Sequence, residues 1–174
     1  MKYEALEVLK NRRAIRAYKP EQITDEALNA VLEAGTYAPT GGGTQGVKIV
    51  AVQSPENVAA VDALNAKVLN NPGAHPYYGA PTILLVFETE ASFTHELDGA
   101  AVCTNMLNAA YAVGLGSCWI HRCKQMFELP EGKALLKRWG LPETLTGVAS
   151  IALGYADCEQ PTAKPRKADY ITRV

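Results

Sequence analysis

Residues 95–113 read HELDGAAVCTNMLNAAYAV, in which alanine, methionine, leucine and valine fall on nearly every face of a helix. A helix that is apolar all round is typical of burial on all sides. We therefore expect this helix to run either through the centre of a domain or between two subunits. Gly114 and Gly116 follow and end the helix, and Ser117–Ile120 predicts a short strand directly after them.

Helical and strand patterns mix along the rest of the chain. Thr24 and Ser54 are good N-caps, and each precedes a stripe of apolar residues at helical spacing. The mixture lacks the strict alternation of a doubly wound sheet, so it favours an α+β fold. The predicted helices cover 3–11, 24–35, 54–69, a short stretch around Met126 and 132–139, and the predicted strands cover 47–52, 81–87 and 146–153.

Length and composition point to an ordinary globular protein. The chain has 174 residues, a net charge of -1 and 48% hydrophobic residues. These values predict a single domain over residues 1–174 and argue against disorder and against a basic surface for nucleic acid. No stretch approaches the roughly 20 apolar residues that span a bilayer, and residues 1–10 lack the apolar core of a signal peptide. We expect a cytoplasmic protein with no membrane or nucleic-acid partner.

Basic residues gather at the two ends of the chain. Nine of the 17 Lys and Arg residues fall in the segments 10–19 and 160–174. Arginine and lysine bind phosphate through charge-assisted hydrogen bonds, so the two ends could converge on one anion. The alternative is two solvated terminal arms. The nine residues are Lys10, Arg12, Arg13, Arg16, Lys19, Lys164, Arg166, Lys167 and Arg173.

The triple glycine at residues 41–43 carries a second signal. It has no Lys-Ser/Thr after it and it precedes a strand, so it is neither a P-loop nor a Rossmann fingerprint. It either lets the backbone approach a flat ligand or forms a mobile surface loop.

Cys118, His121 and Cys123 lie close in sequence, which raises a metal site or a thiol nucleophile as an alternative. Their spacing matches neither one face of a helix nor a known zinc arrangement, and no orienting acid is apparent. The chain also lacks a C-x-x-C pair, so we interpret its four cysteines as reduced thiols. No metal site is predicted.

A series of motifs runs through the chain. NRRAIRAY (11–18) opens it, APTGGGTQ (38–45) and YGAP (78–81) each precede a strand, and Asp98 and NML (105–107) stand in the long helix. GLGSCWIHR (114–122), LGY (153–155) and KPR (164–166) complete it. In this order the motifs resemble those of the FMN-dependent nitroreductases over essentially the whole chain, and GLGSCWI is the most specific of them.

The resemblance implies a nitroreductase-like α+β fold with a central, mainly antiparallel sheet flanked by helices. It also implies a homodimer with the helix of residues 95–113 at the interface, where two FMN sites form. The loop at 39–43 would approach the flavin bound by the partner subunit. NADH or NADPH would donate hydride to flavin N5, and a nitroaromatic, quinone or other electron-poor acceptor would then take it in a ping-pong reaction.

The resemblance also implies roles for individual residues. Lys164 and Arg166 would close on the FMN phosphate, and Arg16 would lie near the pyrimidine end of the flavin, where negative charge develops on reduction. The backbone N–H of His121 would face N5, and no catalytic side chain is required. The implied cofactor-binding residues are Arg12, Arg13, Ala14, Arg16, Pro39, Thr40, Gly41, Gly43, Asn71 (or its neighbour Asn70), Trp119, Ile120, His121, Arg122, Lys164 and Arg166.

Three departures from the family pattern stand out. Ala14 replaces a serine, Gly43 replaces an asparagine, and Gly46-Val47 replaces Pro-Trp. The first two remove polar groups from the implied flavin site. A flavin carrier or sensor without turnover is therefore the alternative to the enzyme, and a hydrolase built on Cys118 and Cys123 is a third hypothesis.

Overall fold

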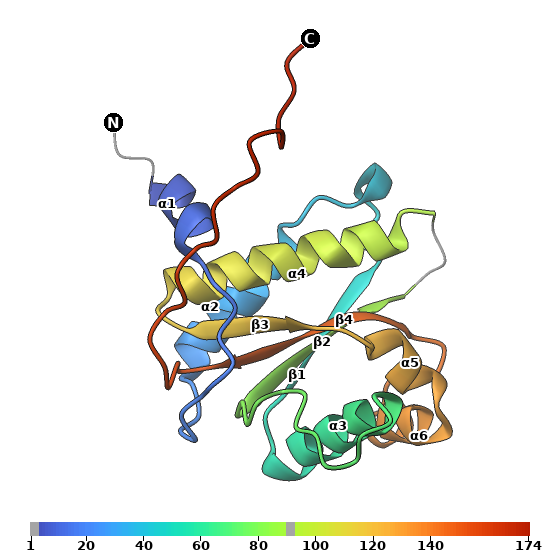
Figure 1. Cartoon of the computed structure of the whole chain (residues 1–174). Coiled ribbons are helices and arrows are strands. Elements are labelled where there is room, and N and C mark those ends of the chain that lie inside the picture. The colour runs from blue at the N-terminus through green and yellow to red at the C-terminus, as the bar shows by residue number, and fades with distance from the viewer. Residues whose placement is uncertain (1–3, 90–92) are drawn as a thin grey trace.

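The computed structural model describes residues 4–89 and 93–174 and has three layers, a sheet between two layers of helices (Figure 1). In this part of the chain four strands pair in the order β1-β2-β4-β3, and the pairs are antiparallel. The prediction of an α+β fold with a mainly antiparallel sheet is therefore confirmed. The strands are β1 (Val47–Val52), β2 (Thr82–Glu88), β3 (Gly116–Ile120) and β4 (Thr146–Gly154).

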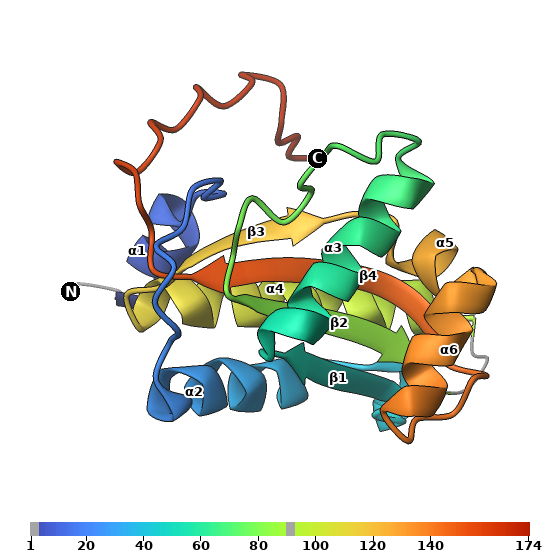
Figure 2. The same cartoon turned by 90° about the horizontal axis from the view of Figure 1, so that it is seen from below.

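Helices cover both faces of this sheet (Figures 1 and 2). One face carries α2 (Asp25–Thr36) and α4 (His95–Ala112), and the other carries α3 (Pro55–Val68), α5 (Cys123–Glu128) and α6 (Pro130–Arg138). The short α1 (Glu4–Asn11) stands apart beside the C-terminal tail, and Gly41–Gly43 forms a 3-10 turn, η1. None of the described helices is long and apolar enough to cross a bilayer.

The predicted elements are found within two residues of their expected ends. The caps explain part of this agreement, because the side chain of Thr24 accepts a hydrogen bond from Ala27 N and that of Ser54 accepts one from Asn57 N. Tyr3, the expected start of the first helix, lies outside the described residues.

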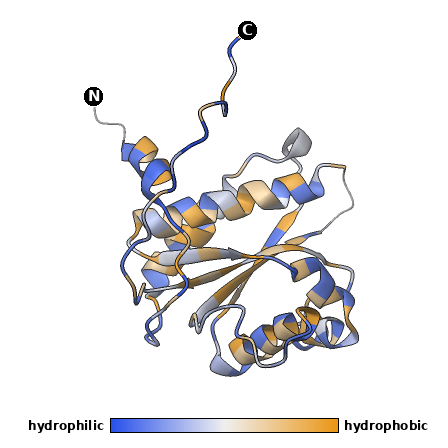
Figure 3. Cartoon of the chain, viewed as in Figure 1, coloured by the Kyte–Doolittle hydropathy of each residue, from blue (hydrophilic) through white to orange (hydrophobic). Residues whose placement is uncertain are grey.

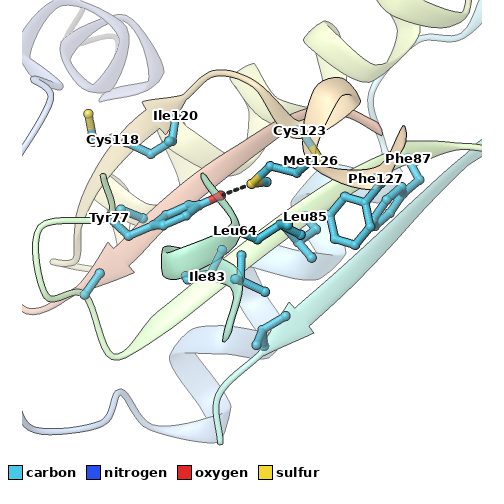
Figure 4. Close-up of a cluster of buried hydrophobic side chains, with 14 of the residues drawn as sticks. Leu64, Tyr77, Ile83, Leu85, Phe87, Cys118, Ile120, Cys123, Met126 and Phe127 are labelled. Atoms are coloured by element: carbon cyan, nitrogen blue, oxygen red, sulfur yellow. Dashed lines mark hydrogen bonds between the residues drawn. The ribbon is translucent and has the colours of Figure 1, made fainter. Parts of the chain in front are cut away.

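The central strand β2 divides the core in two. Alternate side chains of a strand point to opposite faces, so Ile83, Leu85 and Phe87 join the cluster beneath α3, α5 and α6, shown in Figure 4. Leu84 and Val86 join the cluster beneath α2 and α4. All seven residues of β2 are buried. Figure 3 shows apolar stretches on the strands and a mostly polar C-terminal tail.

Helix α4 is buried on one side only. Val102, Cys103 and Met106 face the sheet and are at most 4% exposed, whereas Leu97 is 71% exposed on the other side. The prediction that this helix is buried all round is therefore wrong for the single chain, because periodicity reports how apolar a face is and not what covers it. The helix therefore does not run through the centre of the domain, and a position between two subunits stays a prediction.

Gly132 of α6 offers a test of how closely the helices below the sheet pack. A Cβ at this position would lie 2.1 Å from Met126 O and 2.8 Å from Phe127 Cα, which are backbone atoms of α5. We expect Gly132→Ala to lower the free energy of unfolding by about 1–3 kcal/mol, measured by urea titration, because α6 must move away. Gly46→Ala is the control, since its nearest neighbours would be 3.8 Å away. Equal stabilities of the two variants would contradict the packing.

Candidate flavin site

The segment that follows α1 runs along the outer edge of β3. Ile15 N donates to Ser117 O at 3.0 Å, and Ala14 forms a parallel bridge with Ser117. Farther on, Tyr18 bridges Ala156 beyond the end of β4. An edge strand has unpaired backbone groups on one side, and this segment satisfies part of them. The pairing places the arginines of the segment beside β3.

Arg12 and Arg16 bring positive charge close to Cys118, in the middle of β3. Burial raises the pKa of the Cys118 thiol, and the guanidinium groups of Arg16 and Arg12 oppose part of that shift. Both positive charges are therefore close enough to Cys118 to influence it electrostatically. Arg16 is exposed and Arg12 half-buried, so both remain accessible to a ligand.

A cavity of about 270 Å³ lies where Arg12 and Arg13 meet the start of β3, and we call it the basic pocket. Within the described residues, the buried Ser117 Oγ on its wall has no hydrogen-bond partner, and neither has Arg13 Nε. Two guanidinium groups and a hydroxyl form a donor set that suits a phosphate, so the residues present fit the phosphate end of FMN. Ser117 was not predicted as a site residue; its hydroxyl stands opposite Ala14, where the family pattern has a serine.

Arg13 has a structural contact as well. Its Nη1 donates to the carbonyl oxygens of Lys10 and Arg12, each at 2.7 Å, and so caps the end of α1. The side chain therefore contributes positive charge to the basic pocket from a fixed position.

The other end of β3 presents backbone donors. Ser117 directs its carbonyl to the outer edge, and alternate residues of an antiparallel strand direct their N–H and C=O groups to the same edge. The N–H groups of Trp119 and His121 therefore face away from β4. Trp119 is 37% exposed. Arg122 is left-handed, with φ of 78°, and its Nε donates to Asn65 Oδ1 at 2.7 Å.

The loop between α3 and β2 lies on the same side of the sheet as α3 (Figures 1 and 2). It begins with Asn70 in the left-handed conformation, and Asn71 N donates to Ala66 O across the helix end. Asn71 is exposed. Its predicted role at the flavin ring stays a prediction.

The loop of Pro39, Thr40, Gly41 and Gly43 is built on the start of α4. Gly41 N donates to Asp98 Oδ1 at 3.0 Å, and Asp98 Oδ2 accepts from Thr94. A Cβ at residue 41 would lie 2.3 Å from Thr94 Oγ1, so only glycine allows this close approach. The hydrogen bonds to Asp98 tie the loop to the helix and argue against the free surface loop that the sequence left open.

The chain does not bring all predicted site residues together. The loop at 39–43 contacts the first turn of α4, whereas the basic pocket is lined by Tyr111, Gly114 and Leu115 at its other end. Because α4 has 18 residues, about 27 Å separates the two ends. Residues 12–16, 119–122 and the basic pocket therefore form one half-site, and residues 39–43 form another.

The C-terminal tail starts beside the N-terminal segment and then leaves it. Asp157 N donates to Ala17 O and the Gln160 amide to Asn11 O, so the start of the tail lies beside the N-terminal segment, whereas the convergence of Lys164 and Arg166 on the arginines of 12–16 stays a prediction. Beyond Gln160 the tail is exposed and runs past α1 away from the body of the molecule (Figure 1). The guanidinium of Arg166 bonds to Lys164 O in its own tail.

The cysteines do not form a reactive centre. Cys103, Cys118 and Cys123 are buried, burial raises the pKa of each thiol, to about 12 for Cys103, and the four cysteines are free. A thiol with a raised pKa is a poor nucleophile at neutral pH. Among the described residues no group of three His, Cys, Asp or Glu could hold a metal ion. The geometry thus disfavours the hydrolase hypothesis.

Known proteins share both the sequence pattern and the architecture. The sequence model of the Nitroreductase family matches residues 9–155. A nitroreductase with bound FMN from Bacteroides fragilis has a TM-score of 0.91 and 32% identity, covering 99% of this chain and 100% of that one. A nitroreductase with bound FMN from Desulfitobacterium hafniense has a TM-score of 0.90 and 26% identity, and both chains are covered completely, at 100%.

A further protein resembles this chain in sequence over most of its length. The NADPH-flavin oxidoreductase of Vibrio harveyi is 26% identical over an alignment of 182 positions, gaps included, that covers 92% of this chain and 69% of that protein. The family match spans the N-terminal segment, both cores and the strand that carries the half-site, and the solved structures repeat the nitroreductase-like fold. This chain belongs to the Nitroreductase family.

Proposed function

We propose that this protein is an FMN-dependent oxidoreductase that uses NADH or NADPH to reduce nitroaromatics, quinones or related electron-poor acceptors. The observation that carries the proposal is the basic pocket with its unpartnered Ser117 hydroxyl, at the edge strand of a fold whose solved relatives bind FMN. FMN, when bound, supplies hydride exchange between a nicotinamide and an acceptor. The protein supplies binding, orientation and electrostatics.

The proposed phosphate end is the basic pocket. Arg12 and Arg13 would neutralise the phosphate charge, and the Ser117 hydroxyl would donate in place of the serine that Ala14 lacks. Lys164 and Arg166 lie on the exposed tail, which would fold onto the phosphate or onto a second subunit.

The proposed ring end is the other end of β3. The outward-facing N–H of His121 would donate to the flavin, and Trp119–Arg122 would cover one edge of the ring. Arg16 carries a positive charge beside Cys118 and would stabilise the negative charge that reduction creates. No side-chain general acid or base is required, because water would supply the protons for the acceptor.

A homodimer would complete the site. In one chain the loop at 39–43 lies about 27 Å, the length of α4, from the basic pocket, so this loop would complete the flavin site of a second copy. Leu97 is 71% exposed on the side of α4 that faces away from the sheet, and a partner subunit would bury it. This arrangement would also explain why α4 is apolar on a side that its own chain leaves open.

Two observations favour the alternative of a flavin binder without turnover. Ala14 offers a methyl group where the family pattern has a hydroxyl, and Gly43 has no side chain to contact ribityl or ring. Anaerobic mixing of the yellow protein with NADH or NADPH distinguishes the two functions. We expect the flavin absorbance to bleach within seconds and to return when a quinone is added. A flavin that stays oxidised with both nucleotides would identify a carrier or sensor.

The basic tail provides a second prediction. We expect Lys164→Ala combined with Arg166→Ala to weaken FMN affinity at least tenfold, because two charge-assisted phosphate contacts are lost. Retained flavin absorbance after gel filtration and a fluorescence titration measure the loss. Lys167→Ala combined with Arg173→Ala removes the same charge from the same tail and should bind as the wild type does. A Lys164/Arg166 double variant as yellow as the wild type would exclude these residues from the phosphate site.

The shared site predicts complementation between two defective chains. Arg12→Ala with Arg16→Ala damages one half-site, and Gly41→Val displaces the other by collision with Thr94. A heterodimer of these chains contains one site with both defects and one with neither. We therefore expect mixing through a denaturation and refolding step to restore about a quarter of wild-type FMN binding in a 1:1 mixture, where half the dimers are mixed. No recovery, with both variants dimeric, would show that each chain binds FMN alone.

A further inference from the structure

A chain of buried polar side chains ends at the backbone of the proposed ring site. Asn65 Nδ2 lies 3.3 Å from Tyr77 Oη, Tyr77 Oη lies 2.8 Å from Ser150 Oγ, and Ser150 Oγ lies 3.1 Å from Ile120 O. Asn65 Nδ2 also donates to His121 O at 3.2 Å. Asn65 and Ser150 are 0% exposed and Tyr77 is 1% exposed.

The direction of each hydrogen bond follows from the groups themselves. A serine hydroxyl has one hydrogen, and Ser150 gives it to the Ile120 carbonyl, so Ser150 accepts from Tyr77. Tyr77 in turn accepts from the amide of Asn65. Burial raises the pKa of Tyr77, which keeps its hydroxyl protonated and able to donate. The bonds therefore run one way, from α3 to the end of β3.

These bonds hold two successive peptide groups. In a trans peptide the C=O and the following N–H point in opposite directions. Ser150 holds Ile120 C=O on the sheet side, so the N–H of His121 points outward, as the alternation along β3 also requires. Asn65 holds the next carbonyl, that of His121, and accepts from Arg122 Nε. Arg122 needs this support, because a left-handed φ of 78° is unfavourable for a residue with a side chain.

Tyr77 is itself held at both ends. Its backbone N donates to Asp62 Oδ1 at 3.1 Å, and His75 Nδ1 lies 2.9 Å from Asp62 Oδ2. Its ring is enclosed in the apolar cluster, where the hydroxyl faces Met126 (Figure 4). A phenylalanine would pack in that cluster without the cost of burying a hydroxyl. The polar chain therefore calls for a reason other than packing.

We propose that Asn65, Tyr77 and Ser150 are positioning residues that aim the N–H of His121 at the flavin. The proposal rests on the proposed function and extends it to residues outside the FMN contacts. A fixed N–H favours oxidised flavin, whose N5 accepts a hydrogen bond, over reduced flavin, whose N5 carries a hydrogen. The three residues thereby set the relative affinity of the protein for oxidised and reduced FMN.

The test is the combined variant Tyr77→Phe with Ser150→Ala. The variant removes both partners of the Tyr77–Ser150 bond together, and the Asn65 amide keeps its bonds to His121 O and Arg122 Nε, so we expect the variant to fold. Affinity for oxidised FMN should fall about tenfold relative to reduced FMN, which raises the two-electron midpoint potential by about 30 mV. Ser150→Ala alone should shift the affinity ratio and the midpoint potential in the same direction.

Thr82→Val is the matched control. Thr82 is 0% exposed, bonds to Gln22 at 2.6 Å and pairs with Leu153, away from residues 120–122. Its replacement should lower the melting temperature and leave the affinity ratio and the midpoint potential close to those of the wild type, with the ratio within twofold. If wild type binds FMN and the combined variant keeps its affinity ratio within twofold, the positioning role is overturned. A wild-type protein that does not bind FMN in a fluorescence titration would instead overturn the proposed function, and the proposal with it.

Discussion

The pairing of the N-terminal segment with the outer edge of β3 supports everything else in the candidate site. The hydrogen bond from Ile15 N to Ser117 O covers part of an edge strand that would otherwise expose its backbone groups, and the bridge of Tyr18 with Ala156 fixes the segment beyond the end of β4. The same contacts carry Arg12 and Arg16 to the middle of β3 and close the basic pocket. One segment thus provides both a stabilising backbone pairing and the arginines of the candidate site.

Helix α4 separates the two half-sites by its length. Its first turn holds Gly41 through Asp98, and its last turn lines the basic pocket. A helix cannot shorten without losing backbone hydrogen bonds, so the distance between its ends is as rigid as the fold itself. In the proposed homodimer, the loop at 39–43 would reach the flavin site of the other copy. Leu97, 71% exposed on the open side of α4, marks where the two copies could meet.

Most elements could be predicted from the sequence because their signals are local. Thr24 and Ser54 mark helix starts through hydrogen bonds to residues three positions away, and β2 is recognisable as an unbroken apolar run that is buried on both faces. The arginines of 12–16 and the block 114–122 could be identified by resemblance. Ser117, Asn65, Tyr77 and Ser150 could not, because their roles depend on distant partners: Tyr77 and Ser150 are 73 positions apart, and Ser117 and Ala14 are farther apart still. In the sequence, an isolated serine, asparagine or tyrosine looks the same whether it is exposed or buried in a chain of hydrogen bonds.

The sequence alone was enough to establish the order of helices and strands, the α+β class, the basic character of both ends and the family, since each depends on residues close together or on motifs in a fixed order. Three properties depended on tertiary structure. They are the one-sided burial of α4, the separation of the loop at 39–43 from the basic pocket, and the buried hydrogen bonds that orient residues 120–122. Each of them is a matter of which distant surfaces meet. Local periodicity shows that a face is apolar or that a residue can donate, but only the packed chain shows what lies opposite.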